Sequence, residues 1–388
     1  MRAYDFVIAG GGLAGLSLAC HIVRSPLCGA SMLIVDRNAA AIMGRSWSYW
    51  TQQPTPFDPI VAHAWNALHI AGPAGEKTLN LPGWRYELVR GADLATFARH
   101  ELGLHAHVDF QQGSIERVED GAQGAHVFVD GDPIAAGWVF DSTHWPPPAL
   151  RPAGSVAMYF KAWTVQTHKP AFNPRAVTFL DSRTVQQADL RFFYVLPFSE
   201  REALVAYVAY SRQRPLASAA DAALQTYLHT TLGIAEDDVQ AEETSCLPII
   251  TTQHSRRLGP HRLAIGARAG LIKPTTGFAF RRIQQDSAAI VRSLLTTRKP
   301  WNIPAVSRRH RLYDALLMYV LEHRGAEIRG VFEALFARNP IETVLRFLDE
   351  TTAANEELGI ISTLPTRPFL KAVPGFTAGS LRRAQPWF

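Results

Sequence analysis

Residues 4–37 read YDFVIAGGGLAGLSLACHIVRSPLCGASMLIVDR, and this stretch decides the fold. Apolar residues 6–9 are expected to form a strand, residues 16–24 a helix, and residues 32–35 a second strand. Three glycines, Gly10, Gly12 and Gly15, stand between the first strand and the helix in the pattern G-x-G-x-x-G. Asp36 follows the second strand directly. The segment therefore predicts a complete strand, turn, helix, strand unit.

The chemistry of this turn follows from its residue types. Gly10 permits a tight turn, Gly12 lets the backbone approach a pyrophosphate, and Gly15 allows close packing of helix on strand. The helix N-terminus offers free N–H groups to phosphate, and Asp36 can accept hydrogen bonds from ribose hydroxyls. The pattern predicts a dinucleotide site. FAD is favoured over NAD because a second glycine-bearing motif lies far downstream in the chain.

That second motif is HRLAIGARAGLIKPTTGFAF, residues 261–280. A strand is expected at 262–265, Gly266 and Gly270 bracket a turn, and PTTG at 274–277 precedes a helix that ends near residue 295. Many flavin hydroxylases and reductases carry Gly-Asp at such a strand end, whereas Gly266 is followed here by Ala267. This departure disfavours an ordinary hydroxylase. Backbone N–H groups of 274–277 can still lie near an isoalloxazine ring.

Composition limits the remaining classes. The chain has 388 residues, 47% of them hydrophobic, and a formal charge of +5 without a long basic block, so nucleic acid is not expected as a partner. Three cysteines, Cys20, Cys28 and Cys246, follow no metal spacing, and no metal is predicted. The absence of a signal-peptide pattern and of a long apolar run favours a cytoplasmic protein.

The rest of the chain predicts two further regions. Residues 156–210 alternate apolar and polar side chains in several runs, which indicates an antiparallel sheet with one face lining a cavity. Residues from 308 onward have helical periodicity. The expected fold class is α/β, a GR2-like flavoprotein with a Rossmann-type FAD-binding domain from 1–85, 86–150 and 244–300, an antiparallel substrate sheet at 151–243, and a helical region at 301–388.

Several segments together resemble the flavin-dependent lycopene cyclase family. They lie in family order over most of the chain, and the most specific are the two runs from GARAG through PTTGF and around FFYVLPFS. The full set is GGGLAGLSLA, GRSWSYW at 44–50, YELVRGADLATF at 86–97, VFDS at 139–142, RFFYVLPFSEREALVAYVAYS at 191–211, EETSCLPI at 242–249, GARAGLIKPTTGFAF at 266–280 and VLRFLDETT at 344–352.

The resemblance implies an unusual reaction for a flavoprotein. Such cyclases protonate the terminal double bond of a linear polyene, close a six-membered ring through a carbocation, and lose a proton, so there is no net redox change. Reduced FAD is the active form that the resemblance implies, with NAD(P)H as the expected reductant and an apolar polyene such as lycopene as the expected partner. These steps require a desolvated acid and a long apolar tunnel.

The expected acid is missing. In the family the strand after FFYVLPFS typically reads L-V-E-Y, with the glutamate proposed as the acid, whereas this chain has Leu204, Val205, Ala206 and Tyr207. The chain is either a natural relative with another acid or other chemistry, or an engineered version that lacks this side chain. Asp181, Glu242 and Glu243 are the carboxylates to examine as replacements.

The resemblance also assigns binding residues. Trp47, Tyr49, Phe193 and Tyr207 are expected beside the substrate, with Trp50 close to them. The expected cofactor contacts are Gly10, Gly12, Leu13, Ala14, Gly15, Asp36, Arg37, Arg45, Arg90, Asp141, Gly266, Gly270, Pro274, Thr275, Thr276 and Gly277.

Two other functions remain open from the sequence. A flavin monooxygenase acting on an apolar terpenoid or aromatic substrate would oxidise NADPH and consume oxygen, and a non-catalytic relative would bind flavin without turnover. The basic amphipathic helices after residue 308 also fit peripheral contact with the inner face of a membrane, where an apolar polyene dissolves. Liposome flotation distinguishes a protein on the membrane surface from a purely soluble one. The sequence does not predict the oligomeric state.

Overall fold

The computed structural model describes residues 2–143, 156–234, 237–249, 255–305 and 307–383. Its first layer is a sheet of eight strands, of which five neighbouring strands are all parallel. This arrangement confirms the strand, turn, helix, strand unit predicted at 4–37. In sheet order the parallel strands are β18 (Arg262–Ala264), β11 (Asp132–Asp141), β1 (Ala3–Ala9), β2 (Met32–Asp36) and β8 (Val108–Gln112).

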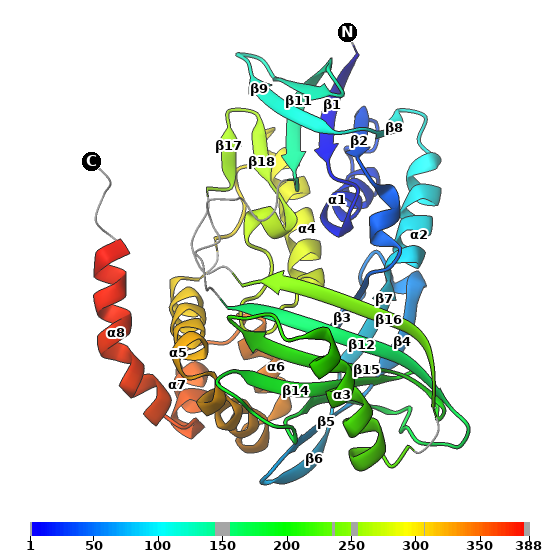
Figure 1. Ribbon diagram of the computed structural model, residues 1–388. Helices are drawn as coiled ribbons and strands as arrows, with labels where there is room; N and C mark the ends of the chain where they lie inside the picture. Colours follow the sequence, from blue (N-terminus) through cyan, green and yellow to red (C-terminus); the bar gives the residue numbers. More distant parts are fainter. Residues whose placement is uncertain (1, 144–155, 235–236, 250–254, 306, 384–388) are drawn as a thin grey trace.

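Shorter elements complete this layer. β17 (Arg257–Gly259) pairs antiparallel with β18, and the hairpin of β9 (Ile115–Asp120) and β10 (Ala125–Val129) extends from β11. Helices α2 (Gly91–Gly103) and α4 (Phe280–Thr297) both pack against α1 (Leu13–Val23), as Figure 1 shows in its upper half. Their apolar faces bury the N-terminal strands in a continuous core.

The second layer is a sheet of seven strands, lower in Figure 1. All its neighbouring strands pair antiparallel except β13 and β5, which are parallel. The alternating residues of 156–210 therefore form the predicted antiparallel sheet. In sheet order the strands are β16 (Asp237–Pro248), β12 (Ala157–Thr167), β15 (Glu202–Ser211), β14 (Leu190–Pro197), β13 (Ala176–Asp181), β5 (Ala67–Gly72) and β6 (Gly75–Asn80).

This sheet has two differently covered faces. One face packs against α3 (Ala217–Thr226), and the other packs against α5 (Arg308–Arg338). Along β15, Leu204, Ala206 and Val208 belong to the core on the α5 side, whereas Val205 and Tyr207 belong to the core under α3. The two-residue period of a strand causes this division.

A third, small sheet joins the two layers. It consists of β3 (Ser46–Thr51), β7 (Arg85–Arg90) and β4 (Val61–Trp65), with β7 in the centre. The segment between β4 and β7 leaves this sheet and supplies β5 and β6 to the seven-stranded one. The sequence analysis assigned residues 67–80 to the cofactor domain and ended the substrate sheet at 243. The structure instead gives β5, β6 and all of β16 to the substrate sheet.

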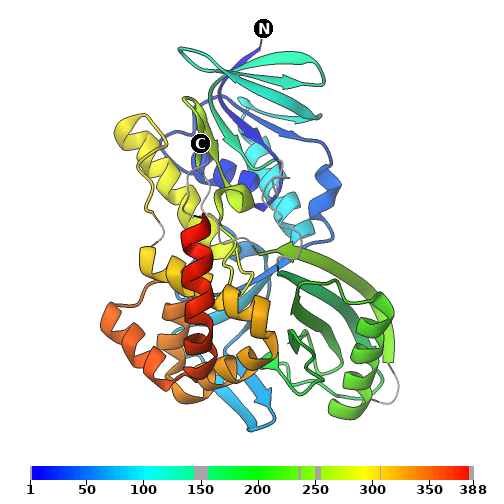
Figure 2. The same cartoon turned by 60° about the vertical axis from the view of Figure 1, so that its left-hand side comes forward.

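The C-terminal helices cover one flank of the molecule, as predicted from 308 onward. They are α5, α6 (Ile341–Leu348), α7 (Ala354–Thr363) and α8 (Arg367–Arg383). α5 bends at Arg324, where the backbone departs from helical angles, and α8 lies along its outer side (Figure 2). None of the helices in the described ranges is long and apolar enough to span a membrane.

Candidate active site

The glycine turn is built to leave a charged ligand room at the start of α1. A Cβ at Gly15 would lie 1.9 Å from the carbonyl oxygen of Gly10, so this position must be glycine for helix and strand to pack. A Cβ at Gly12 would meet no atom within 4 Å. Gly12 is the residue that caps α1, and no side chain bonds the helix's first N–H groups there. Free N–H groups beside open space are what a pyrophosphate requires.

A small cavity lies on one side of this turn. Its volume is about 250 Å³, and its walls include Gly11, Asp36 and Arg99. The Asp36 carboxylate accepts a hydrogen bond of 2.6 Å from the backbone N–H of Gly11. Gln111 and Gln112, at the end of β8, add polar groups. The cavity therefore has the position and polarity that the nucleoside end of a dinucleotide needs, and the residues present fit FAD.

A larger, mostly apolar cavity of about 450 Å³ opens on the other side of the turn. It begins at Gly12, Leu13 and Ala14, passes the loop at 275–279, and runs between the seven-stranded sheet and α5 as far as Phe332. Phe160, Phe179, Phe192, Tyr194, Phe278 and Phe332 supply aromatic walls. A volume of this size is typical of small-molecule sites.

The cavity wall contains one carboxylate among the described residues, that of Glu243 on β16. Burial raises the pKa of Glu243, although the nearby Arg45 guanidinium acts in the opposite direction. A carboxyl with a raised pKa stays protonated closer to neutral pH and can donate a proton. Glu243 is therefore the candidate acid of this site.

The other two carboxylates considered from the sequence lie elsewhere. Glu242 projects from the opposite face of β16 and accepts a hydrogen bond of 2.6 Å from Lys161. Asp181 is fully buried on the α3 side, where Arg183 and Tyr227 donate to it. Burial acts to raise the pKa of Asp181, but these hydrogen bonds outweigh burial and hold it below its usual value. An ionised carboxylate outside the cavity cannot serve as the proton donor.

Strand pairing shows where Ala206, the position of the family's glutamate, lies relative to Glu243. Ala162 on β12 lies opposite Glu243 on one side and opposite Ala206 on the other, and Ala206 lies opposite Tyr194 on β14. The four residues form one row across the sheet, facing the cavity side. Neighbouring strands are about 4.8 Å apart, so Glu243 and Ala206 are separated by roughly 10 Å. Ala206 itself is fully buried beneath the cavity walls.

The predicted substrate residues divide between two sides. Trp47 lines the large cavity. Tyr49 instead stacks on Phe280 at 4.2 Å in the core of the cofactor layer. Phe193 and Tyr207 lie in the core under α3, on the face of the sheet that is turned away from the cavity. For Phe193 and Tyr207, the sequence pattern could not tell which face of the strand borders the cavity.

Some of the predicted cofactor residues line the large cavity, and others lie away from it. Arg45, Thr275, Thr276 and Gly277 line the large cavity, together with Leu13 and Ala14. Pro274 and Gly270 are not among its walls, and Gly266 instead packs closely on Ala14. Arg37 is exposed, and Arg90 lies over the Phe198 ring at 5.6 Å.

Asp141 is hydrogen-bonded to other residues of the protein. Its buried carboxylate accepts hydrogen bonds from Arg262, Arg268 and Thr143, which ties the ends of β11 and β18 together. These hydrogen bonds give Asp141 a structural role at the ends of the two strands, and its contact with the cofactor stays a prediction. Arg99, Gln111 and Gln112 were missed by the sequence analysis, since no motif marks them.

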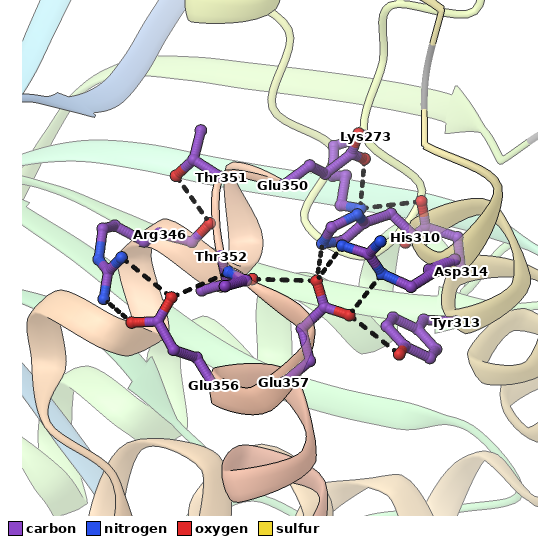
Figure 3. A network of polar contacts seen from close by, with 12 residues as sticks. Lys273, His310, Tyr313, Asp314, Arg346, Glu350, Thr351, Thr352, Glu356 and Glu357 are labelled. Carbon is purple, nitrogen blue, oxygen red and sulfur yellow. Dashed lines mark hydrogen bonds and ion pairs between the residues drawn. The ribbon is translucent and has the colours of Figure 1, made fainter.

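A buried ionic network holds the loop at 274–277 in place. The Lys273 ammonium donates to Asp314 at 2.9 Å and to Glu350 at 2.7 Å (Figure 3). Thr275, a cavity residue, donates to the same Asp314. Lys273 is only 5% exposed. The C-terminal helices thus fix the loop that closes the cavity beside the glycine turn.

Lys273→Met is expected to lower the free energy of unfolding by about 3–5 kcal/mol, because it removes the ammonium that pairs with Asp314 and Glu350 and leaves only the more distant Arg282 beside Glu350. Burial acts to raise the pKa of Glu350, but Lys273 and Arg282 outweigh it and hold it below its usual value. In the wild type the stability from this pairing is present at neutral pH and is lost as the pH falls through that lowered pKa.

The loss of unfolding free energy in Lys273→Met, relative to the wild type, should therefore be largest near pH 7 and should become smaller toward pH 4. Thermal melts of Lys273→Met across this range measure it, with the exposed Lys299→Met as the control. A deficit that is constant with pH would show that charge pairing at Lys273 does not stabilise the loop.

The fold and the two cavities define a Rossmann-type flavoprotein. The chain matches the family model described as "Lycopene cyclase protein" over residues 5–373 and belongs to the lycopene cyclase family. It is 26% identical over 290 residues to a lycopene beta-cyclase from Paracoccus sp. (strain N81106 / MBIC 01143), covering 71% of this chain and 70% of that protein. The resemblance stated from the motifs is confirmed.

Solved structures share the fold at low identity. A geranylgeranyl bacteriochlorophyll reductase-like protein from Thermoplasma acidophilum matches with a TM-score of 0.60 at 14% identity, covering 97% of this chain and 100% of that one. The anhydrotetracycline hydroxylase OxyS from Streptomyces rimosus matches with a TM-score of 0.59 at 17% identity, covering 91% of this chain and 77% of that one. PqsL, a probable FAD-dependent monooxygenase from Pseudomonas aeruginosa, matches with a TM-score of 0.55 at 16% identity, covering 86% of this chain and 100% of that one.

Proposed function

We propose that this protein binds FAD and cyclises the end group of a linear, lycopene-like carotenoid to a β-ionone ring without net oxidation. The observation that carries the proposal is the cavity itself. It is apolar and aromatic, it starts at the glycine turn, and Glu243 is the one carboxylate among its described walls. Family membership supports the same substrate class.

The proposed role of Glu243 is to exchange one proton with the substrate. Its protonated carboxyl donates to the terminal double bond, and the neighbouring double bond supplies the electron pair of the new C–C bond. The ring then releases one proton, which the Glu243 carboxylate can take back, so that atoms and charge balance. Aromatic walls such as Phe278 and Phe332 exclude water and present their π faces to positive charge.

FAD fits the two cavities through the residues around the glycine turn. Gly11, Gly12 and Asp36 would hold the dinucleotide, and the loop at 275–277 would lie beside the ring system. Reduced FAD, formed with NAD(P)H as the proposed reductant, would supply an electron-rich surface next to the reacting carbons. The protein's own side chains supply the proton and the shape of the site.

Product analysis tests this function directly. The purified protein would be incubated with lycopene in detergent and chemically reduced FAD, and carotenoids would be separated by chromatography with absorbance detection. Cyclic products of unchanged mass support the proposal. NADPH oxidation coupled to oxygen uptake, with an oxygenated product, would contradict it in favour of a monooxygenase. Flavin binding without any product would favour a non-catalytic relative.

Gly12→Val is expected to give a folded protein that no longer retains FAD. A Cβ at Gly12 would meet no atom within 4 Å, and Gly12 has an ordinary φ of −84°, so the fold is expected to be kept. Its side chain would instead fill the space before the N-terminus of α1. The measurement is the flavin absorbance of the purified protein together with its melting temperature. Gly29→Val, another glycine with open space around it, is the control.

A flavin spectrum equal to that of the wild type in Gly12→Val would contradict phosphate binding at this turn. A loss of flavin in both variants would point to a general folding defect. The comparison therefore tests the cofactor site independently of catalysis.

A further inference from the structure

Three hydroxyl groups from three strands meet at the wall of the large cavity. They belong to Ser48 on β3, Tyr86 on β7 and Tyr194 on β14. The oxygens of Ser48 and Tyr194 are 2.8 Å apart, those of Tyr86 and Tyr194 are 2.8 Å apart, and Tyr86 donates to Ser48 at 3.0 Å. Ser48 and Tyr194 line the cavity, and Tyr86 is buried behind them. We call these residues the hydroxyl ring.

The hydrogen count fixes the direction of every bond in the hydroxyl ring. Three hydroxyls carry three hydrogens, and three contacts consume all of them. Because Tyr86 donates to Ser48, Tyr194 must donate to Tyr86, and Ser48 must donate to Tyr194. Each oxygen then retains one unshared lone pair. The ring has no hydrogen left to donate and can only accept.

The hydroxyl ring stays neutral, so it acts through oriented dipoles. Burial raises the pKa of both Tyr86 and Tyr194, which keeps the phenol groups protonated. The neighbours of the ring are apolar side chains: Phe179 packs edge-on against both tyrosines, and Leu88 pairs with Ser48 across the strands. In such surroundings fixed dipoles interact with a charge far more strongly than they do in water.

The position of the hydroxyl ring relates it to the proposed chemistry. Tyr194 is the last member of the row that runs from Glu243 through Ala162 and Ala206. The candidate acid and the hydroxyl ring thus lie at the two ends of one row, with two small alanines between them. Acceptors that cannot donate match a cation, and a protonated polyene end group is a cation.

We propose that the Ser48, Tyr86 and Tyr194 hydroxyl ring stabilises the carbocation formed on the substrate end group, with Ser48 and Tyr194 in contact with it and Tyr86 as a positioning residue. This inference rests on the proposed function. The ring exchanges no proton in the reaction, since its lone pairs face the charge and its hydrogens remain in the ring.

The test compares the binding of a cation with that of a hydrocarbon of the same shape. The first probe is an isoprenoid amine, in which a dimethylammonium group replaces the terminal isopropylidene group, and the second is the parent hydrocarbon. The affinity of each probe is measured by titrating the flavin-loaded protein and following its tryptophan fluorescence. Wild type should bind the amine about tenfold more tightly, and Tyr194→Phe should lose most of that preference. Repeating both titrations with Glu243→Gln removes the attraction of the carboxylate.

Turnover provides the second readout. Tyr194→Phe should lower kcat by about 10- to 100-fold and leave KM for lycopene nearly unchanged, because the charge exists only during the reaction. Tyr207→Phe is the matched control, since this tyrosine lies on the other face of the neighbouring strand. It should keep both the amine preference and the rate.

The outcomes separate this inference from the proposed reaction. Equal weakening of amine and hydrocarbon binding in Tyr194→Phe would mean a structural role and would overturn the inference. Tighter binding of an isoprenoid alcohol than of the amine would overturn it as well, because the ring would then recognise a neutral hydroxyl. A wild type that shows the amine preference but forms no cyclic product would overturn the proposed reaction and leave the cation site supported.

Discussion

Ala206→Glu is expected to raise the rate of cyclic product formation by about 10²- to 10⁴-fold, the range of a well-placed general acid. The new carboxyl would stand in the row between Ala162 and Tyr194, on the cavity side of β15. Ala206 is fully buried among apolar neighbours. Burial there would raise the pKa of the introduced carboxyl and keep it protonated near neutral pH.

The matched control is Ala206→Gln, which has nearly the same shape but no acidic proton. Initial rates with lycopene and reduced FAD would be compared at equal flavin occupancy, and melting temperatures would report the cost of the larger side chain. Turnover in Ala206→Glu that equals that of the wild type, in a folded and flavin-loaded protein, would remove position 206 from the chemistry. A gain shared by Ala206→Gln would indicate a change of shape instead of an added acid.

Glu243→Gln is expected to lower the cyclisation rate of the wild type by about 10²- to 10⁴-fold, because it removes the one carboxyl of the described cavity wall. Burial raises the pKa of Glu243 against the opposing effect of Arg45. The protonated form is the donor, so the wild-type rate should fall as the pH rises through this raised pKa. That alkaline limb should vanish in Glu243→Gln.

Asp349→Asn controls for the loss of any buried carboxyl. Burial raises the pKa of Asp349 to about 6 despite its ion pair with Arg281, but its side chain does not line the cavity. The double variant Ala206→Glu, Glu243→Gln supplies a second comparison, in which a new acid should restore turnover. A rate in Glu243→Gln within a few-fold of the wild type would assign the proton to another source.

Sequence reasoning identified the candidate acid only as one of three carboxylates. Glu242 and Glu243 are adjacent, and nothing in the letters shows which of them faces the substrate. Pairing of β16 with β12 decides this, since it turns Glu243 to the cavity and Glu242 toward Lys161. Trp47 and Tyr49 share one face of β3, because they are two residues apart, yet Trp47 lines the cavity whereas Tyr49 stacks on Phe280 in the core of the cofactor layer. Their positions along the strand separate them, and the sequence does not show this.

The hydroxyl ring could not have been predicted from the sequence. Ser48, Tyr86 and Tyr194 are separated by 38 and 108 residues, and each alone is an ordinary strand residue. Their contact depends on the small sheet, which carries Ser48 and Tyr86, meeting the seven-stranded sheet, which carries Tyr194. Likewise, Lys273 and Glu350 meet only because α5 and the turn after α6 pack against the loop at 274–277.

The sequence by itself determined the nucleotide-binding unit at 4–37, the antiparallel strands of 156–210, the helical C-terminal region and membership of the lycopene cyclase family. These follow from local patterns, since glycine spacing and the periods of strand and helix act over a few residues. The tertiary structure alone decided which strands joined which sheet, which face of each strand borders the cavity, and which carboxylate lines it. Those properties depend on contacts between segments far apart in the chain, whose energies no local pattern records.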